Sequence, residues 1–406
     1  MKKNMSRVFV CEISSCLHAL LVLLFLFSGG GALTGCAVSA VPPQARQPFS
    51  TANQPSPTAR RPSAQPYAET VRVLVLTNED FIRIEGAKIE GVKDGGAANI
   101  EARGGGMALN GEPVGGPRRF YPTDEFVYIG DKPFRGVIEV RADKDGLMVI
   151  NEIPLESYIA GIINNEISSR WPVDAIKAQA VIARTYSLYQ KAKRNGAAFD
   201  LTGTHMDQVY TGAGAEDAAA LRAVKETVGE VLFHDGSPAL TVYHSNAGGM
   251  TEASRDVWGS DYPYLRALNS KYDSVAPSYS WELSLSAAKM QEIFKKAGYS
   301  IDEPEAIEPR EVTSTGRVKS LFVKDIFGRR LDLTGEDMRK VIGYSTLRST
   351  LFKVEKRGDE FVFRGRGSGH GVGLSQWGAK GMADAGYGYR EILKYYYPGT
   401  VLRRVY

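Results

Sequence analysis

The chain changes character at residues 151–166, which read NEIPLESYIAGIINNE. Five apolar side chains recur there with the spacing of one helix face: Leu155, Tyr158, Ile159, Ile162 and Ile163. They predict a helix that packs against a core. Glu166 follows this apolar stripe at the predicted end of the helix, where the negative end of the helix dipole disfavours an ionised carboxyl group. Partial burial would raise the pKa of Glu166 further, as an acid catalyst working near neutral pH requires.

A second helix is predicted at residues 171–186, which read WPVDAIKAQAVIARTY. Pro172 and Asp174 are typical of a helix start. Beyond them the helix is apolar or small on nearly every side, and this predicts that the helix is buried.

Two cations are embedded in this second helix, and a buried charge without a partner is very costly. Lys177 and Arg184 either belong to a functional site, together with Gln179, or form structural salt bridges, for example to Glu152 or Glu156. Both alternatives stay open at the level of the sequence.

The flanking segments predict an α+β fold. Residues 67–150 predict a small antiparallel β subdomain, because short β-rich runs alternate with Gly and Asp clusters. These runs lie at residues 71–76, 82–85, 126–129, 137–140 and 147–150. Residues 151–406 predict a domain with helices over 155–193, strands over 231–243, an inserted mixed segment at about 284–360, and a glycine-rich loop followed by a helix over 389–396.

The first 35 residues predict a lipoprotein signal peptide. A basic head precedes an apolar run at residues 17–27, which is about 11 residues long and too short for the roughly 20 residues of a spanning helix. LTGC at residues 33–36 is similar to a lipobox, in which Cys36 would carry the lipid. The alternative is an uncleaved anchor helix with an incidental cysteine. Residues 36–66 are rich in proline and predict an extended linker.

Cysteine use and charge exclude several classes of protein. All three cysteines lie at or before residue 36, so we expect neither a disulfide nor a thiolate metal site in the folded part. The net charge of +4 and the absence of a basic, aromatic-studded stretch argue against nucleic acid as a partner. The chain has no phosphate-binding loop motif, and we expect no cofactor.

Two glycine-rich loops carry polar residues. Residues 243–252 read YHSNAGGMTE, and residues 365–378 read GRGSGHGVGLSQWG. Glycine permits close approach of the backbone, so His244, Ser245 and Gln376 are predicted to line a ligand groove. For His244 and Gln376 the alternative is that they merely hold the loops together. Trp377 either stacks on a ligand ring or belongs to the core.

Together these blocks resemble the SpoIID/LytB family of sporulation and cell-wall proteins. The matching pieces lie in family order at residues 134–136, 151–166, 171–186, 207–210, 243–252 and 367–378. The resemblance implies a lytic transglycosylase that cleaves peptidoglycan glycan strands, preferentially those stripped of stem peptides, and leaves 1,6-anhydro-N-acetylmuramic ends. It places the catalytic glutamate on Glu166. The substrate-binding residues that we expect are Lys177, Gln179, Arg184, Tyr186, His244, Ser245 and Gln376.

The chemistry of a lytic enzyme agrees with a single acid. Hydrolytic glycosidases usually need two carboxylates, whereas in lytic cleavage the 6-hydroxyl of the sugar is the nucleophile. Glu166 could protonate the leaving oxygen and then accept the hydroxyl proton. Asp207, Glu252 and Asp256 are available as second carboxylates, but the sequence gives none of them a distance.

The resemblance leaves an alternative function open and has one departure. The LytB branch implies an amidase enhancer, a glycan-binding accessory protein without chemistry of its own that assists a cell-wall amidase. Some family members bind zinc through histidine and cysteines. This chain lacks those cysteines, and its histidines at 205, 234, 244 and 370 have no ligand spacing, so we expect no metal. We expect an exported, lipid-anchored protein that faces the cell wall, in the periplasm or at the outer membrane if the cell has two membranes.

Overall fold

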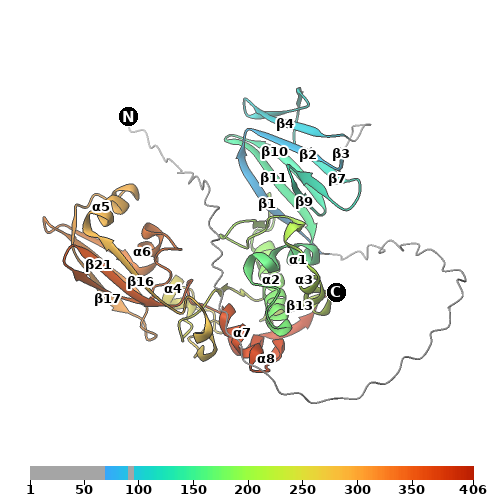
Figure 1. Ribbon diagram of the computed structural model, residues 1–406. Helices are drawn as coiled ribbons and strands as arrows, with labels where there is room; N and C mark the ends of the chain where they lie inside the picture. Colours follow the sequence, from blue (N-terminus) through green and yellow to red (C-terminus); the bar gives the residue numbers. More distant parts are fainter. Residues whose placement is uncertain (1–68, 90–95) are drawn as a thin grey trace, which may run out of the picture. The chain divides into compact units, whose positions relative to one another are not determined.

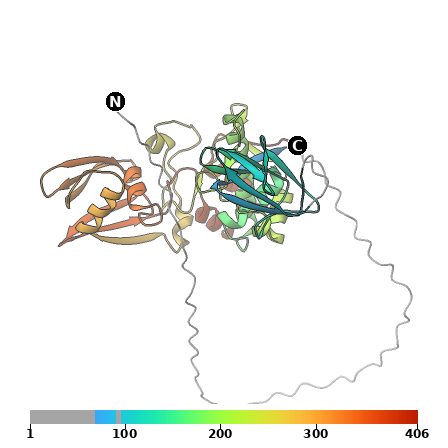
Figure 2. The ribbon, with the colours of Figure 1, turned by 90° about the horizontal axis from the view of Figure 1, so that it is seen from above.

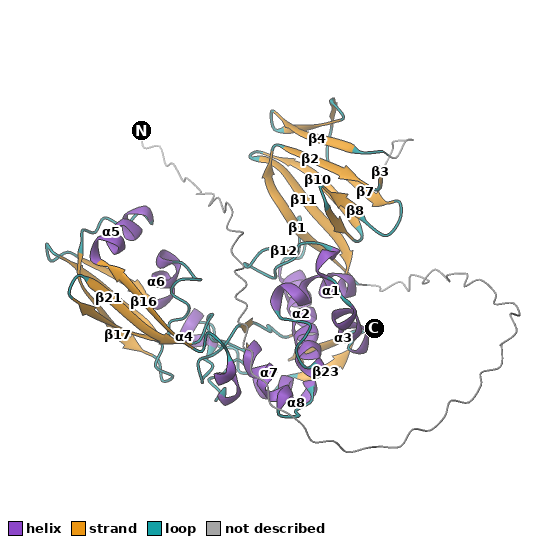
Figure 3. Ribbon diagram, in the orientation of Figure 1, coloured by secondary structure: helices purple, strands orange, loops and turns teal. Residues whose placement is uncertain are grey.

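The computed structural model describes residues 69–89 and 96–406. The predicted signal peptide, Cys36 and the linker over 36–66 lie outside the described residues. Helices and strands are both abundant in the described part, and the predicted α+β class is confirmed (Figure 3). No helix in the described ranges is both long and apolar enough to cross a membrane.

The N-terminal strands form two six-stranded sheets that share one hydrophobic core (Figure 1). The first sheet has the order β12 (Leu201–Thr202), β1 (Thr70–Glu79), β11 (Gly146–Pro154), β10 (Val137–Asp143), β7 (Arg118–Pro122) and β3 (Ala87–Ile89). The second has the order β6 (Glu112–Val114), β5 (Gly106–Leu109), β4 (Ala98–Arg103), β2 (Phe81–Glu85), β8 (Val127–Ile129) and β9 (Lys132–Phe134). Neighbouring strands are antiparallel except for β12, which pairs with β1 in parallel.

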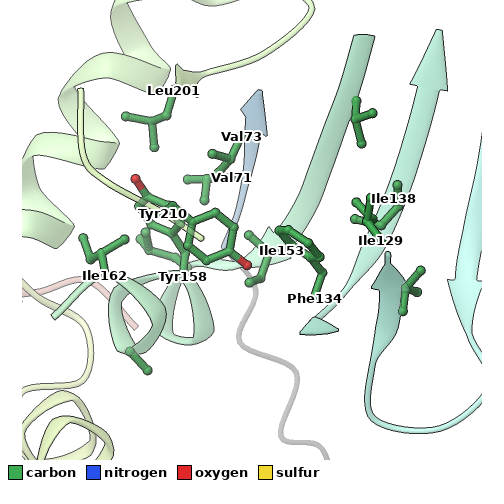
Figure 4. Close-up of a cluster of buried hydrophobic side chains, with 14 of the residues drawn as sticks. Val71, Val73, Ile129, Phe134, Ile138, Ile153, Tyr158, Ile162, Leu201 and Tyr210 are labelled. Carbon is green, nitrogen blue, oxygen red and sulfur yellow. The ribbon is translucent and has the colours of Figure 1, made fainter. Parts of the chain in front are cut away.

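Helix α1 (Leu155–Glu166) follows β11 without a loop, and Pro154 occupies its N-cap position. Its predicted apolar face is buried in the same core as the sheets. Figure 4 shows Tyr158 of this helix beside Tyr210, with Ile162 on one side of the two rings and Ile153 of β11 on the other. The rings of Tyr158 and Tyr210 have centroids 5.2 Å apart. This packing fixes the direction of α1, and so the position of Glu166 at its end.

Helix α2 (Val173–Lys193) lies between two cores, which explains why it is apolar all round. One side, with Ile176 and Ala180, belongs to the core of the β sheets and α1. The other side, with Val181 and Ile182, belongs to a second core. Helix α3 (Ala218–Glu226) packs on both α1 and α2 and follows a 3-10 turn at Ala213–Ala215.

The second core joins C-terminal helices to short strands. Its elements are β13 (Glu230–His234), β14 (Ser237–Pro238), β15 (Tyr243–His244), α4 (Ser254–Trp258), a 3-10 turn at Lys271–Val275, β22 (Leu374–Ser375), α7 (Gln376–Asp384), α8 (Tyr389–Tyr396) and β23 (Val401–Arg404). Strands β15 and β22 pair in parallel, and an isolated bridge joins Asn246 to Ser368. The two glycine-rich loops are therefore adjacent, although more than a hundred residues separate them in the sequence.

A segment with its own hydrophobic core lies between these two loops in the sequence (orange in Figures 1 and 2). One of its sheets has the order β16 (Ser280–Ser286), β21 (Glu360–Arg366) and β20 (Phe352–Arg357). The other has the order β17 (Pro304–Val312), β18 (Val318–Asp325) and β19 (Arg330–Thr334). Helices α5 (Ala287–Lys296) and α6 (Gly335–Ile342) pack on these strands. We call the chain from β16 to β21 the inserted segment.

Candidate active site

A cavity of about 560 Å³ lies at the C-terminal end of α1. Residues 164–171 form one wall, and Asp217, Ser245, Gln376 and Trp377 complete the lining. The fold thus brings Glu166 together with the two glycine-rich loops, as expected for a shared site. We call this cavity the Glu166 cavity.

Glu166 is the last residue of α1, as the sequence predicts. The chain leaves the helix at Ile167, which is extended. One carboxylate oxygen, Oε1, accepts a hydrogen bond of 3.0 Å from the backbone N–H of Val209. The Tyr243 hydroxyl donates to the same carboxylate. Burial nevertheless outweighs both hydrogen bonds and raises the pKa of Glu166 above its ordinary value. A carboxyl group with a raised pKa keeps its proton to a higher pH than an ordinary glutamate, which favours its use as an acid.

The groups behind Glu166 are neutral. Gln208 Nε2 donates to the Tyr243 hydroxyl at 3.4 Å, and the Tyr158 hydroxyl donates to Gln208 Oε1 at 3.3 Å. Burial raises the pKa of both tyrosines well above the ordinary value, so they stay protonated. Among the described residues, Glu166 has no ion-pair partner that would lower its pKa. The surroundings therefore favour the protonated acid.

Two tryptophans flank the cavity. The rings of Trp171 and Trp377 have centroids 5.0 Å apart and planes inclined by 58°. Both side chains are only half-buried and both line the cavity, so Trp377 belongs to the cavity wall. The backbone N–H of Trp377 donates to the Ser245 carbonyl oxygen at 3.0 Å. This hydrogen bond fixes the two glycine-rich loops next to each other, with Gln376 beside Ser245 at the cavity.

The structure places the cations predicted for the site elsewhere. Lys177 forms an ion pair of 2.6 Å with Glu226 and lies over the ring of Tyr389. Arg184 is fully buried and donates two hydrogen bonds, of 2.8 and 2.6 Å, to the carboxylate of Glu156. For both Lys177 and Arg184 the structure thus shows the second alternative, a structural salt bridge. The salt bridge gives each buried or half-buried charge the partner that it needs.

Gln179 and Tyr186 are also separated from the Glu166 cavity. Gln179 is buried, and its side-chain amide has no hydrogen-bond partner among the described residues. The Tyr186 hydroxyl donates to Asp207 at 3.0 Å and accepts from Gln190 at 2.7 Å. Both side chains project from α2 into packed surroundings rather than into the cavity.

His244 is buried beneath its loop and does not line the cavity. Its Nδ1 lies 3.1 Å from the carbonyl oxygen of Val372, and its ring is 5.4 Å from that of His370. His370 in turn contacts the carbonyl oxygen of Tyr243 through Nε2 at 3.0 Å. Each histidine thus joins one glycine-rich loop to the other. For His244 the geometry favours the loop-holding alternative, whereas Gln376 reaches the cavity.

The three carboxylates considered as partners of Glu166 have other surroundings. Asp207 pairs with Arg194 at 2.8 Å, and this pairing together with hydrogen bonds from Thr202 lowers the pKa of Asp207 against the opposing effect of burial. Glu252 is fully buried and accepts hydrogen bonds from Thr313, at 2.6 Å, and from Thr315. Glu252 and Asp256 border a different cavity, of about 270 Å³.

The carboxylate that does share the Glu166 cavity is Asp217, which the sequence interpretation missed. It is the N-cap residue of α3 and accepts hydrogen bonds from the Ala220 backbone N–H at 2.8 Å and from the Ser169 hydroxyl at 2.5 Å. These hydrogen bonds lower the pKa of Asp217. The pattern of Asp before a helix was visible in the sequence. Its place in the cavity depends on the packing of α3 against α1.

Metal binding has no support in the described ranges. Within residues 69–89 and 96–406, no three His, Cys, Asp or Glu side chains are grouped so that they could hold a metal ion. The expectation that the protein binds no metal stays a prediction.

Fold and cavity together define an α+β protein in which Glu166, a carboxyl group of raised pKa, lines a cavity bordered by both glycine-rich loops. The sequence profile described as Stage II sporulation protein (SpoIID) matches residues 143–234. A second profile, Domain of unknown function (DUF8618), matches residues 260–373, which include the inserted segment.

Relatives extend over most of the chain. Stage II sporulation protein D of Bacillus subtilis is 32% identical over 267 residues, which are 62% of this chain and 75% of that protein. The amidase enhancer of the same organism is 31% identical over 363 residues, 76% of this chain and 50% of the relative, so the match spans half the length of that protein. An uncharacterized protein of Brachyspira hyodysenteriae is 31% identical over 336 residues, 82% of this chain and 84% of that protein. The chain belongs to the SpoIID family, and the resemblance seen in the sequence is confirmed.

Proposed function

We propose that this protein is a peptidoglycan lytic transglycosylase of the bacterial cell wall and that Glu166 is its general acid and base. The observation that supports this most directly is the carboxyl group of Glu166, whose pKa is raised by burial and which lines an open cavity. A cell-wall role agrees with relatives named stage II sporulation protein D and amidase enhancer.

The second carboxylate of the cavity is poorly suited to hydrolytic chemistry. Asp217 is engaged as the N-cap of α3 and by Ser169, so each of its two carboxylate oxygens already accepts a hydrogen bond within the protein. A retaining or inverting hydrolase needs a second carboxylate that is free to attack the sugar or to activate water. A lytic enzyme has no such need, because the substrate supplies the nucleophile. The engagement of Asp217 therefore supports lytic cleavage.

In the proposed reaction, protonated Glu166 donates its proton to the glycosidic oxygen while the bond from that oxygen to C1 of N-acetylmuramic acid breaks. The 6-hydroxyl oxygen of the same sugar then bonds to C1, and its proton passes to the Glu166 carboxylate. The products are a free 4-hydroxyl group and a 1,6-anhydro ring, and Glu166 ends protonated without consuming water. The Val209 N–H and the Tyr243 hydroxyl stabilise the transient carboxylate.

Ser245 and Gln376 are proposed to bind the substrate, since both line the Glu166 cavity. Trp171 and Trp377 offer half-buried aromatic faces on which a pyranose ring could stack. We further propose that Cys36 carries a lipid that holds the protein on a membrane facing the wall, and that a cell-wall amidase is a partner.

The second candidate function is a glycan-binding accessory protein that enhances an amidase without cleaving glycan. The relative named amidase enhancer favours it. The same cavity would then bind the glycan strand, and Glu166 would contribute a hydrogen bond rather than a proton.

Glu166→Gln distinguishes the two functions, because glutamine keeps the size and the hydrogen-bonding capacity of glutamate but cannot transfer a proton. The lytic enzyme should release anhydro-muramyl products from denuded strands, and the variant should release them about 10² to 10⁴ times more slowly while still binding the strands. Mass spectrometry of digested strands, intact and denuded, measures the products.

Asp217→Asn is the matched control. It removes the other carboxylate of the cavity, and asparagine is as good an N-cap residue as aspartate. We expect near wild-type cleavage. A wild type that binds strands and releases nothing would establish the accessory protein. Equal cleavage by wild type and Glu166→Gln would place the acid elsewhere, and a loss in Asp217→Asn as large as in Glu166→Gln would indicate two-carboxylate chemistry.

A further inference from the structure

Among the described residues that line the Glu166 cavity, one carries a positive charge, Arg170. It lies four residues after Glu166, in the loop between α1 and α2. The volume of the cavity, about 560 Å³, falls within the roughly 300 to 1,000 Å³ of ligand sites, where a few polar groups set orientation and specificity. The charge of Arg170 therefore bears on what the cavity binds.

The side chain of Arg170 is free to bind a ligand. It is exposed, and it forms neither an ion pair nor a side-chain hydrogen bond with another described residue. Asp217 lines the same cavity, but its two carboxylate oxygens accept hydrogen bonds from Ala220 and Ser169. A guanidinium group stays charged in proteins. The cavity thus offers one cation that no protein carboxylate holds.

The backbone that carries Arg170 is held in place. The backbone N–H of Ser169 donates to Asn164 Oδ1 at 3.0 Å, and the Ser169 hydroxyl donates to Asp217 at 2.5 Å. On the other side of Arg170, the ring of Trp171 lies in the cavity wall. Fixed neighbours keep the guanidinium group at the cavity, so that binding has to order only the arginine side chain itself.

The proposed substrate has one group that matches this cation. An N-acetylmuramic residue carries a lactyl ether on C3, and this ether ends in a carboxyl group. C3 is separated from C1, where Glu166 is proposed to act, by a single ring atom, so a strand placed for cleavage has its lactyl group near Glu166. The carboxyl group is ionised when free and is a neutral amide when a stem peptide is attached. A guanidinium group pairs with a carboxylate through two parallel, charge-assisted hydrogen bonds, which an amide cannot match.

We propose that Arg170 binds the free lactyl carboxylate of the N-acetylmuramic residue in the Glu166 cavity, and that it thereby makes the protein selective for strands without stem peptides. The proposal rests on the proposed function, since it takes a glycan strand as the ligand. Arg170 is a specificity-determining residue in this arrangement, because it holds a group that does not react, while Glu166 transfers the proton.

The test compares wild type with Arg170→Gln on two substrates: denuded strands with free lactyl carboxylates, and the same strands after conversion of these groups to methylamides. Arg170 is exposed and unpaired, so the change spares the fold. Lys225→Gln is the matched control for the lost charge. Lys225 is an exposed lysine of α3 that does not line the cavity and has no ion pair with a described residue. Binding is measured in the Glu166→Gln background, and cleavage in the active protein.

Wild type and control should bind free strands about two- to fivefold more tightly than amidated strands, as one partly exposed ion pair gives. In Arg170→Gln this ratio should fall to about one, and the loss in cleavage of free strands should appear in KM rather than in kcat. Arg170→Lys keeps the charge but not the paired hydrogen bonds, and it should restore part of the ratio.

An unchanged ratio in Arg170→Gln would overturn the assignment, and so would an equal loss on both substrates, which indicates a structural role. Peptide-bearing strands form a third arm. If wild type preferred them over both other substrates and Arg170→Gln lost that preference, the partner of Arg170 would be a carboxylate of the stem peptide, contrary to the proposal. If wild type released no product from either strand while the binding ratio behaved as expected, the lytic function would fail and the specificity of Arg170 would stand.

Discussion

Glu166 combines a position that the sequence predicts with surroundings that it does not. The apolar stripe of α1 and its end at Glu166 follow from helical periodicity. The sequence also predicts the direction of the pKa shift of Glu166, which is upward. Its hydrogen-bond partners, Val209 and Tyr243, come from distant loops that only the folded chain brings near. Arg184 shows the same limit. The sequence requires a partner for a buried charge, but packing decides that the partner is Glu156.

The raised pKa of Glu166 predicts a cost in stability near neutral pH. The folded protein binds this proton more tightly than the unfolded chain, whose carboxyl group titrates near 4.5. The stabilising contribution is therefore complete below pH 4.5 and is lost as the pH rises through the raised pKa. Glu166→Gln should unfold at a higher denaturant concentration than wild type at pH 7, by a free energy on the order of 1 kcal/mol.

The gain should disappear when both proteins are unfolded at pH 4, where Glu166 is protonated in either state. Paired urea titrations at the two pH values measure the difference. A variant that is less stable than wild type at pH 7 would mean that the hydrogen bonds to the carboxylate outweigh the effect of its burial.

At the level of elements, sequence patterns located α1, α8 and the long strands, since each has clear periodicity or strong β propensity. The pairing of β15 with β22 was not predictable, because strands of two residues have no period to detect. The glycines were the available signal. Gly373 has φ +73°, and a Cβ atom there would collide with the Val242 carbonyl oxygen, so this approach of the two loops requires glycine.

The histidines between these loops predict a pH dependence. Burial lowers the pKa of His244 well below 6.5 and that of His370 to about 4. Arg317 and Arg339 oppose protonation of both rings. The unfolded chain takes up these protons near pH 6.5 and the folded protein only at lower pH, so stability falls as the pH decreases from 6.5 towards 4.

His370→Gln should therefore be less stable at pH 7, by about 1 to 3 kcal/mol for the lost hydrogen bonds, but should lose less further stability between pH 6.5 and 4. Thermal unfolding across this range measures both effects, and His205→Gln, at an exposed position, controls for the replacement itself. If His370→Gln kept the full pH slope of wild type, other groups would account for it.

On the scale of the whole molecule, the first two hydrophobic cores share the apolar helix α2, whereas polar contacts join the core of the inserted segment to the glycine-rich loops. The inserted segment reaches the glycine-rich loops through the turn between β17 and β18. Arg317, only 1% exposed, donates from Nη2 to the carbonyl oxygens of Ala247, at 2.7 Å, and Met250, at 3.3 Å. Thr313 in the same turn donates to Glu252. Composition predicted a mixed inserted segment, but a single arginine gave no sign that it would join two cores.

This junction predicts that the inserted segment and the rest of the described fold unfold cooperatively through Arg317. Arg317→Ala leaves two buried carbonyl oxygens without their donor, which costs about 1 to 3 kcal/mol. The lost free energy weakens the contact between two cores and leaves the packing inside each core unchanged. Calorimetry should show one transition for wild type. In the variant, an earlier transition of the inserted segment should appear, lower by several degrees for each kcal/mol in a domain of this size.

Arg310→Ala is the matched control, since Arg310 lies on β17 with its side chain 55% exposed and only a loose ion pair of 3.6 Å to Asp332. It should melt like wild type, because exposed pairs contribute roughly 0 to 1 kcal/mol. Two transitions already in wild type would contradict cooperative unfolding, and a single unshifted transition in Arg317→Ala would remove Arg317 from the junction. If the cores do unfold together, the inserted segment also stabilises the loops that carry Ser245 and Gln376, since the turn of Arg317 and Thr313 bonds to residues within five positions of Ser245 and to Glu252.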